Sequence, residues 1–145
     1  MRELQTDNSI AVTLTNSFFE LAALLEKIDD VCSVRGLDAE VRYCVRVIVE
    51  EMITNLIKYG YADNERHLIG FFLEIGSDHL LLKIEDDGVS FDPFVSLQHA
   101  GGRSGKDKAH GGHGLLMVKS MIDDSRYEQV NGKNLLTIWK RVRAG

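Results

Sequence analysis

Glu51 and Asn55 stand four positions apart in a segment whose apolar residues recur with helical spacing. At this spacing two side chains lie one above the other on the same face of a helix. A carboxylate can act as a general base, and a neighbouring amide oxygen can coordinate Mg²⁺ without taking up the proton. The same pair is also common on solvated helix faces, so this interpretation needs support from the rest of the chain.

A second group of polar residues follows a predicted strand and reads Asp86-Asp87-Gly88-Val89-Ser90-Phe91-Asp92-Pro93. Asp86 shares the parity of the apolar positions 80, 82 and 84, which places its carboxylate on the buried face of that strand. Because an unpaired buried charge is costly, we expect this carboxylate to have a partner. Gly88 allows the backbone to approach a ligand closely, although Asp-Gly after a strand is most often only a turn.

A third group is rich in glycine and precedes a predicted helix, with the sequence Gly111-Gly112-His113-Gly114-Leu115. Free backbone N–H groups and the helix dipole favour an anion at such a position, and a flexible hinge is the alternative interpretation. Residues 101–106 lack the first glycine of a Walker A loop, Asp107 stands where Ser or Thr belongs, and Gly111-x-x-Gly114 follows no strand. The sequence therefore excludes the P-loop and Rossmann phosphate sites.

The elements that must position these groups are predicted from periodicity and from capping residues. Asn16 or Ser17 caps a first helix, Asp38 caps a longer second helix, and Gly60 stops it. The predicted order is a strand over 10–14, a helix ending near 35–36, a helix to 59, a hairpin over 69–75 and 80–86, a loop over 92–114, a helix over 115–122 and a hairpin over 125–130 and 135–141. Loops as long as the predicted one are uncommon in compact domains and are often functional lids.

The composition is that of a globular protein, with 145 residues of which 44% are hydrophobic and 27% charged. These values exclude disordered and collagen-like classes. The formal net charge of −5 argues against sequence-independent binding to nucleic acid or to anionic lipid. With no long apolar stretch and no signal peptide, we expect one cytoplasmic domain over residues 1–145 that binds neither nucleic acid nor a membrane.

In chain order, the three groups resemble the N, G1 and G2 boxes of the GHKL ATPase superfamily, which has the Bergerat fold. The resemblance runs from the first helix to the closing strand and points to a bacterial branch, the anti-sigma factor serine-protein kinases. Ser90 in place of the second G1 glycine favours this branch, whereas Tyr59 stands where the family commonly has histidine. The implied fold is α+β, a two-layer α/β sandwich with helices packed on one face of a mixed, mostly antiparallel sheet.

The resemblance implies a role for each matching residue. Asn55 would ligate a Mg²⁺ that bridges the phosphates of ATP, Asp86 would accept a hydrogen bond from the adenine amino group, and Glu51 would be the general base toward a substrate serine. The other nucleotide-binding residues would be Gly88, Gly111, Gly112, Gly114 and Leu115. A lid over residues 93–110 would bring Arg103, Lys106 or Lys108 near the γ-phosphate. Phosphoryl transfer needs little beyond a metal, anion-binding amides and an aligned nucleophile.

The same resemblance implies an anti-sigma regulatory factor with ATP-dependent serine-protein kinase activity in the bacterial cytoplasm. Such a protein would form a homodimer, bind a sigma factor and phosphorylate an anti-anti-sigma partner on serine. The alternative is an ATP-gated interaction module with weak or no kinase activity, which the presence of Glu51 disfavours. The short segment before the second helix disfavours a sensor histidine kinase, and the chain length disfavours a gyrase-like ATPase with a further domain.

Overall fold

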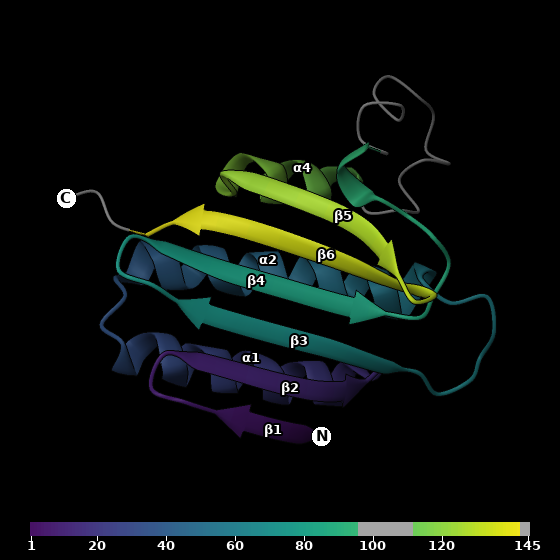
Figure 1. Cartoon of the computed structure of the whole chain (residues 1–145), viewed down its shortest axis with the longest axis horizontal. Helices are drawn as coiled ribbons and strands as arrows, with labels where there is room; N and C mark the ends of the chain where they lie inside the picture. Colours follow the sequence, from purple (N-terminus) through teal and green to yellow (C-terminus); the bar gives the residue numbers. More distant parts are fainter. Residues whose placement is uncertain (96–111, 143–145) are drawn as a thin grey trace.

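In the computed structural model, which describes residues 1–95 and 112–142, the chain forms one antiparallel sheet and a layer of helices (Figure 1). The strands stand side by side in the order β1-β2-β3-β4-β6-β5. Their bounds are Arg2–Gln5 (β1), Ser9–Thr15 (β2), Leu68–Ile75 (β3), His79–Asp86 (β4), Asp124–Val130 (β5) and Lys133–Arg141 (β6). The helices are α1 (Phe18–Val34), α2 (Ala39–Tyr59) and α4 (Gly112–Met121).

Capping residues set the ends of the two long helices. The hydroxyl of Ser17 accepts hydrogen bonds from two first-turn N–H groups of α1, so Ser17 and not Asn16 is the cap. The carboxylate of Asp38 accepts from the N–H of Val41 at 2.9 Å at the start of α2. These bonds satisfy N–H groups that have no partner within a helix. Gly60 is the C-cap residue of α2, as predicted.

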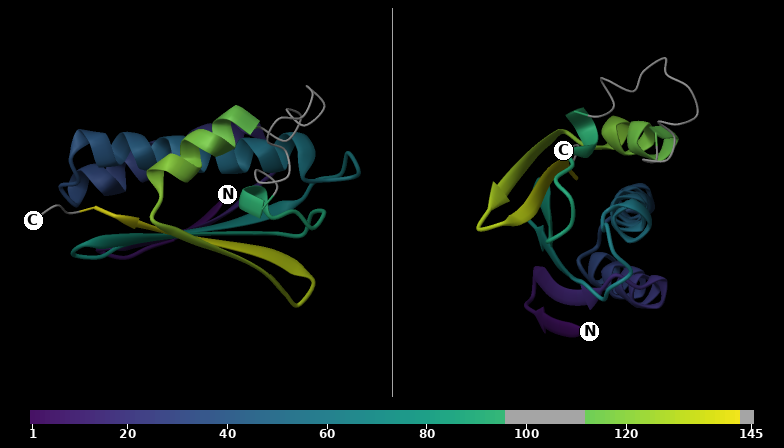
Figure 2. Two further views of the ribbon diagram at one scale, coloured as in Figure 1. Left: turned by 90° about the horizontal axis from the view of Figure 1, so that it is seen from above. Right: turned by 90° about the vertical axis from the view of Figure 1, so that its right-hand side faces the viewer.

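Helices α1, α2 and α4 all lie on one face of the sheet (Figure 2). Alternate residues of the central strands point to this helical layer and are buried, as Leu73 in β3 and Leu82 in β4 illustrate. The opposite face carries the half-buried side chains of Phe72 and Leu81. This arrangement confirms the predicted α+β fold, with all pairings antiparallel among the described residues.

The structure departs from the predicted elements at two places. Strand β1 was not predicted, because all four of its residues are exposed and it lacks an alternating apolar pattern. It pairs along β2, so the predicted strand over 10–14 is not at the edge of the sheet. Helix α4 begins at Gly112 instead of 115, which places Gly112 and Gly114 in its first turn and not in a loop. Among the described helices, none has the length and apolar character needed to cross a membrane.

Candidate functional site

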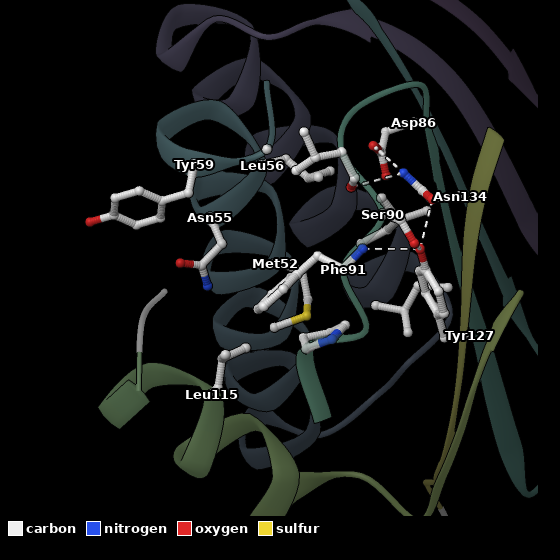
Figure 3. Close-up of a pocket in the computed structure, with 15 residues that line it drawn as sticks. Met52, Asn55, Leu56, Tyr59, Asp86, Ser90, Phe91, Leu115, Tyr127 and Asn134 are labelled. Atoms are coloured by element: carbon white, nitrogen blue, oxygen red, sulfur yellow. Dashed lines mark hydrogen bonds between the residues drawn. The ribbon is translucent and has the colours of Figure 1, made fainter. Parts of the chain in front are cut away.

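A pocket of about 210 Å³ lies between α2, the ends of β4 and β6, and the start of α4 (Figure 3). Helix α2 forms one wall through Met52, Asn55, Leu56 and Tyr59, whose spacing of three, four and seven places them on one face of the helix. The other lining residues are Gly60, Ile84, Asp86, Val89, Ser90, Phe91, Pro93, Leu115, Tyr127, Asn134 and Leu136. Because most of this wall is apolar, its few polar side chains are the candidate binding groups.

Asp86 is the last residue of β4, and it is buried, with 6% of its surface exposed. Its Oδ2 atom accepts hydrogen bonds from Asn134 Nδ2 at 3.1 Å and from the backbone N–H of Gly88 at 2.7 Å. Burial raises the pKa of this carboxyl above its ordinary value, and the two hydrogen bonds oppose that shift. The prediction of an inward-facing carboxylate with a partner is confirmed.

Asn134 connects Asp86 to the rest of the pocket, and the sequence reasoning missed it. It lies opposite Asp86 in the pairing of β4 with β6 and is 5% exposed. Its Nδ2 group is also within 3.1 Å of the carbonyl oxygen of Gly88, and its Oδ1 accepts from the hydroxyl of Tyr127 at 2.7 Å. That hydroxyl in turn accepts from the backbone N–H of Phe91 at 3.1 Å. Tyr127 in β5 and Asn134 in β6 therefore hold the segment after β4 in place through these hydrogen bonds.

The close backbone approach predicted at Gly88 is made to Gly60, the residue that ends α2. A Cβ atom at position 88 would collide with the carbonyl oxygen of Gly60. The same carbonyl accepts a hydrogen bond from the N–H of Val89 at 2.8 Å. Gly88 does not line the pocket, whereas Gly60 and Val89 on either side of this contact do. Gly88 therefore supports the pocket wall, and its predicted binding of nucleotide stays a prediction.

Glu51 and Asn55 lie together on α2, as predicted, and Gly114 of α4 lies against Glu51. Asn55 Nδ2 donates to the backbone carbonyl of Glu51 at 2.9 Å, and the amide oxygen of Asn55 is turned away from the helix (Figure 3). The carboxylate of Glu51 lies against Gly114 in the first turn of α4, so closely that a Cβ atom at position 114 would collide with it. Glu51 is half-buried, so it is not part of a fully solvated helix face.

Of the remaining residues predicted to bind nucleotide or to form the lid, the structure describes some and not others. Leu115 is 1% exposed and lines the pocket, and Gly112 begins α4. Within the predicted lid, Pro93 lines the pocket and Phe94 is buried in the core, so the beginning of this segment belongs to the pocket wall. The other predicted positions, which are Gly111, Arg103, Lys106 and Lys108, lie outside the described residues.

The two ends of the pocket differ in chemistry. Asp86, Asn134 and Tyr127 lie at one end, and Asn55 and Tyr59 lie on the opposite side, with apolar side chains between them (Figure 3). A buried carboxylate above apolar walls suits a flat heterocycle that carries a hydrogen-bond donor. An amide oxygen beside the first turn of a helix suits a metal ion and an anion. The pocket therefore has a buried carboxylate acceptor at one end and an amide oxygen at the other, with apolar walls between them.

The antiparallel sheet, the helical layer on one face and the pocket between α2 and α4 define a histidine kinase-like ATPase fold. The sequence matches the histidine kinase-like ATPase domain family over residues 15–140, and the chain belongs to this family. The structure is similar to the crystal structure of the RsbU and RsbW domains of Rv1364c from Mycobacterium tuberculosis. That likeness has a TM-score of 0.63 at 15% identity, over 92% of this chain and 32% of the other, and it shows the fold.

Among curated proteins, the chain is similar to several bacterial protein kinases. It is 32% identical over 92 residues to the serine-protein kinase RsbW of Oceanobacillus iheyensis, which covers 61% of this chain and 58% of that protein. It is 26% identical over 134 residues to RsbW of Staphylococcus epidermidis, covering 89% and 76%. The serine/threonine-protein kinase BtrW of Bordetella bronchiseptica is 26% identical over 100 residues, covering 69% and 70%. The alignments span between 58% and 76% of the lengths of these kinases.

Proposed function

We propose that this protein is an ATP-dependent serine-protein kinase and anti-sigma regulatory factor. The observation that carries the proposal is the convergence of Asp86, Asn55 and Glu51, which come from β4 and α2, at one pocket and its rim. Each of these residues has the chemistry that its predicted role needs, and the kinases to which the chain is similar support the same activity.

At the base end, Asp86 is the acceptor for the adenine amino group. Its Oδ2 is occupied by Asn134 and Gly88, while its Oδ1 has no hydrogen bond to any described residue. One oxygen therefore holds the carboxylate in place, and the other is available to a ligand donor. An adenine ring would then lie against the apolar side chains of Met52 and Leu115.

At the phosphate end, the residues present fit a Mg²⁺ ion. The Nδ2 group of Asn55 is engaged by the Glu51 carbonyl, so the amide is fixed with its oxygen directed outward. Mg²⁺ in nucleotide sites takes few protein ligands and completes its shell with phosphate oxygens and water, and it neutralises charge that develops during phosphoryl transfer. The backbone N–H groups in the first turn of α4, from Gly112 onward, are suited to receive phosphate oxygens.

Glu51 is the candidate general base that takes the proton from a substrate serine hydroxyl. Its carboxylate lies at the first turn of α4, where the phosphates are expected, and one helical turn from Asn55. The substrate is an anti-anti-sigma protein, and a sigma factor is the partner that the protein binds and silences. A homodimer in the bacterial cytoplasm belongs to the same proposal, which follows the predicted branch.

Phosphorylation of candidate partners tests the proposal. The protein is incubated with γ-labelled ATP, Mg²⁺ and the products of neighbouring genes, in parallel with Glu51→Ala and Glu50→Ala. Glu51→Ala should slow serine phosphorylation by roughly 10²–10⁴-fold, the usual contribution of a positioned base, and should leave ATP affinity nearly unchanged. Glu50 is exposed and points about 100° away around the helix, so Glu50→Ala should react at the wild-type rate.

Two outcomes would contradict parts of this proposal. If the wild-type protein binds a sigma factor in an ATP-dependent way but phosphorylates no candidate, the ATP-gated interaction module replaces the kinase. If Glu51→Ala reacts at the wild-type rate, Glu51 is not the base. Circular dichroism of each variant checks the fold, because Glu51 is half-buried and contacts Gly114.

A further inference from the structure

His67 lies outside the pocket, in the segment between α2 and β3, and none of the roles above uses it. Its ring is held between two carboxylates, because Nε2 lies 2.6 Å from Asp63 Oδ1 and Nδ1 lies 3.0 Å from Asp87 Oδ1. The side chain of His67 is only 16% exposed. Both ring nitrogens therefore face a carboxylate oxygen in a largely enclosed position.

This geometry favours the protonated form of the ring. A neutral imidazole carries one N–H group, so its second nitrogen would turn a lone pair toward a carboxylate. Only the imidazolium donates to both Asp63 and Asp87. In agreement, the hydrogen bond to Asp63, followed by that to Asp87, raises the pKa of His67 above its ordinary value of 6.5.

Two further described residues contact His67, and both are uncharged. The ring of Tyr61 stacks on the imidazole with 4.1 Å between ring centroids and 13° between planes. Burial raises the pKa of the Tyr61 hydroxyl, so this group stays neutral at physiological pH. From the connection between β2 and α1, Asn16 Oδ1 accepts from the backbone N–H of His67 at 3.0 Å. Asn16 N–H donates to the carbonyl of His67 at 3.1 Å, so the backbone at His67 is fixed.

The contact between His67 and Asp87 is connected to the pocket wall by the short segment 87–89. Asp87 follows Asp86 directly, and Val89 two residues later donates to the Gly60 carbonyl at 2.8 Å. Residues 60–67 are therefore attached to residues 87–89 at both of their ends. Because Gly60 and Val89 line the pocket, a movement of Asp87 would shift the wall next to Asp86.

We propose that His67 is a positioning residue for nucleotide binding, which as an imidazolium holds Asp87 and thereby the turn that carries Asp86. The inference rests on the proposed function, because it concerns the affinity of the same pocket. When the pH rises through the pKa of His67, one of its two hydrogen bonds is lost. The turn after β4 then loses an anchor, and the affinity for adenine nucleotide falls.

The test is the pH dependence of ATP binding, measured by calorimetry with Mg²⁺ between about pH 6 and 8.5, which spans the titration range of histidine. Wild-type affinity should fall by roughly fivefold or more across this range, a typical size for coupling between two sites. His67→Arg should bind tightly without this decline, because a guanidinium stays charged and donates several hydrogen bonds. His67→Ala should bind weakly at every pH. The protonation of ATP itself is common to all variants and cancels in the comparison.

His79→Ala is the matched control. His79 also has a carboxylate neighbour, with Nδ1 at 2.9 Å from Asp78 Oδ1, but it lies at the opposite end of β4 from Asp86. This variant should keep the wild-type affinity and pH profile. Thermal melts at each pH check that every variant is folded, and if His67→Ala does not fold, the comparison with His67→Arg still decides the matter.

The outcomes separate this inference from the proposed function. Tight wild-type binding that does not decline with pH, or a decline of the same size in His67→Arg, would overturn the role of His67 and leave the kinase proposal standing. Absence of ATP binding by the folded wild-type protein at every pH would overturn the proposed function itself.

Discussion

Asp86→Asn distinguishes the two oxygens of the buried carboxylate. In the wild-type protein Oδ2 accepts from Asn134 and Gly88, and Oδ1 has no hydrogen bond to a described residue. The single carbonyl oxygen of an asparagine can take the position of Oδ2 and keep both internal bonds. Its NH₂ group then replaces Oδ1 and faces the ligand, so that a donor meets the amino group of adenine.

The expected loss of ATP affinity is that of a hydrogen bond to a charged acceptor, about 1.5–3 kcal/mol, or roughly 10–150-fold in Kd. Calorimetry with Mg²⁺ and ATP measures it. Inosine triphosphate sharpens the test, because its ring carries an oxygen acceptor where adenine carries the amino group. The preference for ATP over inosine triphosphate should shrink or reverse in Asp86→Asn. Asp78→Asn, an exposed change at the far end of the same hairpin, should alter neither affinity.

Stability should hardly change in Asp86→Asn, because the internal hydrogen bonds remain and a buried charge is removed. This expectation separates binding from folding. Unchanged affinity for ATP in a folded Asp86→Asn protein would remove Asp86 from the base site. A large loss of stability would instead show that the carboxylate is needed by Asn134 and Gly88, and the assignment of its two oxygens would be wrong.

Two further predictions concern catalysis and assembly. Gly114→Ala should displace the Glu51 carboxylate and slow serine phosphorylation by up to about 100-fold. Gly70→Ala, where a Cβ atom would meet Glu85 at an ordinary 3.6 Å, should keep the wild-type rate. The protein should scatter light as a homodimer, an expectation that rests on the resemblance to the anti-sigma branch. A stable 16.3 kDa species at high micromolar concentration, with and without nucleotide, would contradict the homodimer.

The fold could be predicted where local signals agree. The caps at Ser17 and Asp38 set the starts of α1 and α2, and the alternating apolar pattern identified β3 and β4 as the two strands of a hairpin. The turn at Asn131 and Gly132, both with positive φ, fixed the last hairpin. Strand β1 could not be predicted because its pairing with β2 depends on backbone hydrogen bonds and not on an apolar pattern.

The site was predictable only in part, because several of its contacts join distant segments. Asn134 carried a usable signal, since it has the same inward parity as Leu136 and Ile138 when the strand is extended backward. No such signal marks His67, whose partners come from its own loop and from the end of β4. The close approach of Gly114 to Glu51 depends on how α4 packs on α2, which the spacing within either helix does not specify.

Asp86 and His67, which contacts the adjacent Asp87 from the segment before β3, respond to pH in opposite ways. Burial raises the pKa of Asp86, so ionising it costs folding free energy as the pH rises through that pKa. In the proposed site the ionised carboxylate is the form that accepts a hydrogen bond from the adenine amino group, so affinity should be lost as the pH falls. His67, whose pKa is also raised, supports the turn at low pH and ceases to do so as the pH rises. ATP binding should therefore be strongest at a pH between the pKa values of Asp86 and His67. In that range the buried carboxylate of Asp86 is ionised, and the imidazolium of His67 still holds the turn in place.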